Sequence, residues 1–188
     1  MKKLIFLCSV IAIISACSSS DNKTQQADKM NSQDQIEITN DLENAFSIIP
    51  SWYNENHVIE MTAPPAHSGT FACITNDTLQ YSYYFKEVLK NINKGLPVKV
   101  SVSGWVYTTA LNPTFSIVCN IDESGKSVNW KAVPLKDDLN EAGKWVEFNA
   151  NFFYDNVQLK PEDEIGILAW NQDKKTVYID DLKIVFQY

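Results

Sequence analysis

The stretch Thr176-Val177-Tyr178-Ile179-Asp180-Asp181-Leu182-Lys183-Ile184-Val185-Phe186 near the end of the chain decides the fold prediction. Its residues alternate as a β-strand requires. Strict alternation places Tyr178, Asp180, Leu182, Ile184 and Phe186 on one face, and Val177 and Ile179 on the other. Asp180 therefore shares a face with apolar side chains. A carboxylate in such a place needs a cation or several hydrogen-bond donors beside it.

Similar short segments fill the chain before this strand. They are separated by turn residues and are rich in Val, Ile, Tyr and Phe, which favour strands. The expected strands cover 36–42, 58–61, 70–74, 81–85, 98–107, 114–121, 127–133, 145–153 and 164–171. One short helix is expected near 86–93, before the stop signal Gly95-Leu96-Pro97. The fold class is therefore all-β: a two-sheet antiparallel β-sandwich (jelly roll) of about nine or ten strands.

Composition and charge exclude some functions. The 188 residues are 45% hydrophobic and carry a net charge of −7, and all 16 basic residues are lysines. An acidic chain without arginine or basic clusters is a poor nucleic-acid binder. We therefore expect one folded domain, at 36–188, that binds no nucleic acid.

The first 16 residues have the features of a lipoprotein signal peptide. Lys2 and Lys3 precede an apolar run at 4–14, and Ile14-Ser15-Ala16-Cys17 resembles the bacterial lipobox. A plain secretory signal with an incidental cysteine is the alternative. Residues 17–35 then form the lipidated Cys17 and a polar, flexible tether. By analogy, Ser18 predicts an outer-membrane lipoprotein, lipid-anchored on the periplasmic or cell-surface face.

Two cysteines remain in the expected domain, Cys73 and Cys119. In an exported protein they could form one disulfide. Both lie in apolar strand-like runs, so two buried free thiols are equally compatible with the sequence.

Four segments together resemble the galactose-binding-like jelly roll, especially its carbohydrate-binding-module branch. They are Asn40-Asp41-Leu42-Glu43, His67-Ser68-Gly69-Thr70, the strand at 98–107 and Tyr178-Ile179-Asp180-Asp181-Leu182, in this order. The resemblance implies a structural calcium ion held by Glu43, Asp180 and backbone carbonyls near Ser68 or Thr70. The alternative is that Asp180 accepts backbone N–H bonds from a neighbouring loop, without a metal.

Aromatic residues are the candidate ligand contacts, because sugar rings stack their apolar faces on amphipathic aromatic rings. The candidate rings have Ser, Asn or Gln nearby in the sequence and are Trp105, Tyr107, Trp130 and Trp170. Asn171, which follows Trp170, is the candidate contact to a sugar hydroxyl. For each ring, packing inside the fold is the alternative. We assign Trp52 and Trp145 to packing.

Motifs of catalysis are missing from the sequence. It contains no His-Glu-x-x-His, no Gly-x-Ser-x-Gly and no Glu-x-Asp-x-x-Glu pattern. We therefore expect a membrane-anchored, non-catalytic carbohydrate-binding lipoprotein. An accessory or adhesion lipoprotein that binds a surface protein through the same fold is the alternative, and a small glycan-active hydrolase is a third hypothesis.

Overall fold

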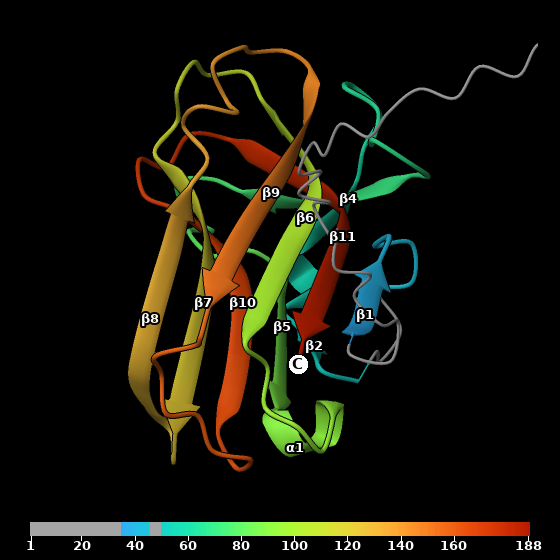
Figure 1. Cartoon of the computed structure of the whole chain (residues 1–188). Coiled ribbons are helices and arrows are strands. Elements are labelled where there is room, and N and C mark those ends of the chain that lie inside the picture. Colours follow the sequence, from blue (N-terminus) through green and yellow to red (C-terminus); the bar gives the residue numbers. More distant parts are fainter. Residues whose placement is uncertain (1–34, 46–49) are drawn as a thin grey trace, which may run out of the picture. The chain divides into compact units, whose positions relative to one another are not determined.

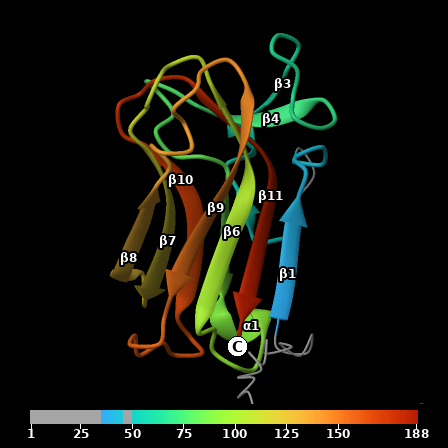
Figure 2. The ribbon, with the colours of Figure 1, turned by 45° about the horizontal axis from the view of Figure 1, so that its top comes forward.

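Two antiparallel β-sheets face each other across one hydrophobic core (Figures 1 and 2). This computed structural model describes residues 35–45 and 50–188. The predicted signal peptide, Cys17 and nearly all of the predicted tether lie outside the described residues. One sheet has the strand order β3-β4-β11-β6-β9, with β1 paired to β11, and the other has the order β2-β5-β10-β7-β8.

The six-stranded sheet contains β1 (Gln35–Asn40), β3 (Val58–Glu60), β4 (Phe71–Thr75), β6 (Lys99–Thr108), β9 (Trp145–Phe153) and β11 (Val177–Gln187). The five-stranded sheet contains β2 (Trp52–Tyr53), β5 (Tyr84–Val88), β7 (Phe115–Glu123), β8 (Lys126–Pro134) and β10 (Glu164–Asn171). The all-β sandwich is confirmed. The expected helix is shorter than predicted, because β5 continues to Val88 and α1 covers only Leu89–Ile92.

The core forms where the inward residues of the two sheets meet. Val100, Val102 and Val106 of β6 are buried, as their alternation predicts. Cys73 of β4 and Cys119 of β7 are buried free thiols, so the disulfide alternative is not realised. Burial raises the pKa of each thiol to about 12, which keeps both protonated.

The alternation of β11 breaks in the middle of the strand. Asp180 pairs with Trp105 of β6 and Lys183 pairs with Ser103, so β11 carries one extra residue at this point. Asp181 has φ 50°, the left-handed conformation of a bulge residue. The extra residue moves the following side chains to the other face. The prediction that Tyr178 and Asp180 share a face with Ile184 and Phe186 is therefore wrong.

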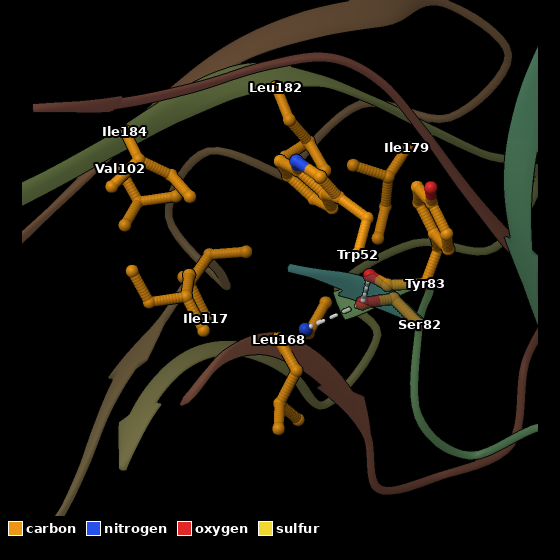
Figure 3. A pocket seen from close by; sticks show the side chains of 11 residues that line it. Trp52, Ser82, Tyr83, Val102, Ile117, Leu168, Ile179, Leu182 and Ile184 are labelled. Atoms are coloured by element: carbon orange, nitrogen blue, oxygen red, sulfur yellow. Dashed lines mark hydrogen bonds between the residues drawn. The ribbon is translucent and has the colours of Figure 1, made fainter. Parts of the chain in front are cut away.

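The cavity shown in Figure 3 is too small for a ligand. This apolar void between the sheets, lined by residues that include Trp52, Ile117 and Ile184, measures about 10 Å³ (Figure 3). A volume of that size is close to the limit for one water molecule. None of the helices in the described part of the chain has the length and apolar character needed to cross a membrane.

Candidate functional site

Two of the predicted ligand contacts, Trp130 and Trp170, meet on the outer face of the five-stranded sheet. Trp130 lies on β8 and Trp170 on β10, on either side of β7. Their ring centroids are 6.1 Å apart and their planes are at 82°. Trp130 is 45% exposed. On β7, Val118 has outward parity yet is fully buried, as expected for a side chain beneath two such rings. The pair forms an aromatic surface open to solvent.

Three tyrosines that the sequence analysis did not single out extend this surface. Tyr53 of β2 pairs with Tyr84 of β5, and their rings stack with centroids 5.4 Å apart. Tyr53 is 47% exposed, and the exposed Tyr81 pairs with Trp170. Alternation would place Tyr81 on the face of the buried Tyr83 and Phe85, so only Tyr84 could have been predicted to point outward from Phe85. The two-residue strand that presents Tyr53 has no such signal.

A polar strip lies beside the two aromatic pairs, toward the end of the sheet where β10 begins. Lys86 of β5 forms an ion pair with Glu164 of β10. Asn120 of β7, which pairs with Trp130, donates to Asp122 (2.7 Å) and accepts from Ser127 (2.5 Å). The hydrogen bond to Glu164 is the main cause that raises the pKa of Lys86. Lys86 and Glu164 balance each other, and Asp122 leaves the strip with one net negative charge beside its uncharged hydrogen-bonding groups.

The other two predicted rings, Trp105 and Tyr107, lie on the six-stranded sheet. The ring of His67, in the loop 61–70, stacks on Trp105 with centroids 3.9 Å apart and planes at 13°. Tyr107 is only 9% exposed and lies against Trp145. His67 of this loop thus occupies one face of Trp105, and packing leaves little of Tyr107 accessible; ligand contact at either residue stays a prediction.

Asn171 needs correction as a ligand contact. Its side chain is fully buried and points inward, where Nδ2 donates to Thr75 Oγ1 (3.1 Å) and to the carbonyl of Lys175 (2.6 Å). Asn171 therefore ties the end of β10 to the following loop.

The assignment of Trp52 and Trp145 to packing is confirmed. Trp52 is buried and stacks on Tyr83 with centroids 5.3 Å apart. The indole of Trp145 donates to the carbonyl of Pro65 (3.0 Å), so this ring helps to hold the loop that covers the sheet.

Asp180 is held by the same loop. Its Oδ2 accepts the backbone N–H groups of His67 (2.9 Å) and Ser68 (3.1 Å), and its Oδ1 accepts the N–H of Asp181 (2.7 Å). Burial raises the pKa of Asp180 to about 6, against the lowering effect of these hydrogen bonds. The fully buried carboxyl thus fastens the loop to β11.

Glu43 fastens the other end of the loop. Its Oε1 accepts the N–H groups of Thr70 (2.8 Å) and Phe71 (2.9 Å). Within residues 35–45 and 50–188, no group of three or more His, Cys, Asp or Glu side chains is arranged to hold a metal. The N–H bonds support the alternative in which loop donors satisfy Asp180. A calcium ion at Glu43 and Asp180 stays a prediction.

Solved structures of similar fold include carbohydrate-binding modules. The chain shares their jelly roll. One is the CBM22-2 xylan-binding domain of Xyn10C from Paenibacillus barcinonensis, with a TM-score of 0.56 and 13% identity over 80% of this chain and 99% of that one. Another is the CBM22-1 domain of the same protein, with a TM-score of 0.50 and 16% identity over 80% and 93%. No family model and no curated protein sequence matches the chain. At these identities the likeness concerns the fold.

Proposed function

We propose that residues 36–188 form a non-catalytic carbohydrate-binding domain, and that the glycan lies on the outer face of the five-stranded sheet. The observation that carries this proposal is the aromatic pair of the exposed Trp130 and the half-buried Trp170 beside the polar strip. Aromatic rings stack on the apolar faces of sugars, while amides and paired charges bond to hydroxyl groups. The shared fold with xylan-binding domains supports a glycan as the ligand.

The carboxylates near this face support a role without catalysis. Glycoside hydrolysis needs two carboxyl groups that flank the scissile bond, one of them poised to donate a proton. Glu164 is paired with Lys86, and Asp122 accepts a hydrogen bond from Asn120. Both carboxylates are engaged within the sheet itself, which suits binding better than proton transfer.

The amino-terminal sequence supports a location at the outer membrane. We propose that Cys17, the cysteine of Ile14-Ser15-Ala16-Cys17, carries the lipid that anchors the protein to the outer membrane. Two or more acyl chains hold a protein stably, whereas one is marginal. The polar segment that follows would let the domain reach a glycan on the periplasmic or the cell-surface side.

Affinity electrophoresis and titration calorimetry with soluble polysaccharides, including xylan and β-1,4-galactan, test the binding face. We expect Trp130→Ala and Trp170→Ala each to weaken binding by more than about 10-fold. Aromatic rings that become buried in a complex dominate its binding energy. Phe153→Ala is the matched control. Phe153 is 56% exposed but lies on β9 of the other sheet, so its removal should leave binding unchanged.

Two results would overturn the proposal. One is the retention of none of the polysaccharides by the wild-type protein. The other is an affinity that both tryptophan variants leave unchanged while their melting temperatures show that they are folded.

A further inference from the structure

A pocket of about 240 Å³ lies at one end of the five-stranded sheet. The loops that follow β6, β8 and β10 gather at this end (Figure 1). They contribute the polar lining residues Asn112, Thr114, Lys136 and Gln172, and the sheet contributes Ser116 and Pro134. The residues that line this pocket are not part of the aromatic surface or of the polar strip described above.

The pocket begins beside the aromatic surface. Trp170 of β10 pairs with Ser116 of β7, and Ser116 pairs with Pro134 of β8. Residues paired directly across neighbouring strands point to the same face of a sheet. A ligand in contact with Trp170 can therefore extend over Ser116 into the pocket.

Backbone hydrogen bonds fix the pocket walls. The N–H of Thr114 donates to Asp173 (2.9 Å), and the N–H of Gln172 donates to the carbonyl of Thr114 (2.9 Å). These bonds join the loop before β7 to the loop after β10. The side chains of Thr114 and Gln172 are thus presented by a pre-organised backbone, which lowers the entropic cost of binding.

The chemistry of the lining suits an uncharged, hydroxyl-rich group. Ser116 is only 3% exposed, and its hydroxyl accepts a long hydrogen bond of 3.4 Å from Gln172 Nε2. Hydroxyl and amide groups both donate and accept. Lys136 is the charged side chain of the lining, but Asp137 and Asp138 follow it directly. An anionic ligand would therefore gain little from this charge.

We propose that this pocket holds a sugar unit that ends a chain, either the terminus of the main chain or a side branch, while neighbouring units contact Trp170 and Trp130. This inference rests on the proposed glycan-binding function. The loop residues Asn112 and Lys136 bound the pocket beyond the ends of β7 and β8. A chain that enters from the sheet would meet these loops on the far side of the pocket.

Titration calorimetry with three probes tests the pocket: unsubstituted xylan, arabinose-substituted xylan and short xylo-oligosaccharides, with the corresponding β-1,4-galactan series beside them. Tighter binding of the short oligosaccharides identifies a main-chain terminus, and tighter binding of the substituted polymer identifies a side branch. Thr114→Val and Gln172→Leu should each reduce this preference by about 2- to 10-fold, the value of one hydrogen bond. Their binding to the unsubstituted polymer should remain unchanged.

Matched controls are Thr62→Val and Gln158→Leu, which change exposed residues in other loops. The pocket proposal fails if the wild-type protein shows no preference, or if both pocket variants keep it. In those cases the proposed function still stands, provided that Trp130→Ala weakens binding to the polysaccharide as expected above. If no probe is bound at all, the proposed function fails and the pocket proposal fails with it.

Discussion

Raising the pH from about 4 to about 7 is expected to destabilise the wild-type domain relative to an Asp180→Asn variant. Burial raises the pKa of Asp180 from 3.8 to about 6. Because the folded state holds this proton more tightly than the unfolded chain, the stabilising effect is complete below pH 3.8 and is lost as the pH rises through about 6. A shift of this size corresponds to roughly 3 kcal/mol. The carboxyl is fully buried, so solvent does not screen it.

Urea denaturation followed by tryptophan fluorescence, at a series of pH values and with EDTA present, measures this effect. Asn has the volume of Asp but does not titrate. Carboxylates such as Asp173, whose pKa is lowered, stabilise the protein in the opposite pH direction. They are common to both proteins, so they cancel in the difference between the two free energies of unfolding. That difference should change by roughly 3 kcal/mol across the window in favour of the variant.

A difference that stays flat, or that shifts toward the wild-type protein as the pH rises, would refute this account of Asp180. Repeating the titration with added calcium separates the two interpretations of the carboxyl. A cation beside Asp180 favours its charged form and lowers its pKa. Bound calcium would therefore reverse the sign of the pH dependence, whereas loop N–H donors alone leave it unchanged.

Three further outcomes are expected. If calcium binds at Glu43 and Asp180, EDTA lowers the melting temperature and calcium restores it; no change on chelation would contradict the metal. Cys17→Ser should move the protein from the membrane fraction to the soluble fraction, and continued sedimentation with membranes would contradict the lipid anchor. Gly69→Ala should cost more than about 2 kcal/mol in a melting experiment, because Gly69 has φ +57° and an added Cβ would lie 2.3 Å from Glu43 Cδ. The control Gly143→Ala, with φ +81° and nothing within 4 Å, should cost only about 1 kcal/mol, and equal costs would contradict the close contact.

The long strands could be predicted from the sequence because their alternation is a local property. In β9, Phe148, Ala150 and Phe152 are buried, and the residues between them are exposed. The strand β2 has no comparable signal, since its two residues become a strand only by pairing with Tyr84 and Phe85 of β5. For a similar reason the predicted strand 81–85 ends too early. The pairing of β5 with β10 extends the strand to Val88.

The bulge in β11 can be recognised in the sequence from the positions of the apolar residues. Apolar residues occupy odd positions before the two aspartates, at Val177 and Ile179, and even positions after them, at Ile184 and Phe186. Such a change of phase is what one extra residue in a strand produces. The partner strand provides the space, since a Cβ at Gly104 would lie 3.0 Å from the carbonyl oxygen of Asp180. A strict period of two could not describe this strand.

Whether an outward aromatic ring is exposed depends on whether a loop packs against it, and the alternation of a strand does not predict this. Trp105 and Trp130 have the same local pattern, an outward ring beside polar neighbours on a strand. The loop 61–70 covers Trp105 because Asp180 and Glu43 hold that loop through four backbone N–H bonds. Trp130 is 45% exposed on the other sheet. The bulge, which leaves Asp180 on the outer face of β11, thus supplies one of the two carboxylates that hold the loop against Trp105.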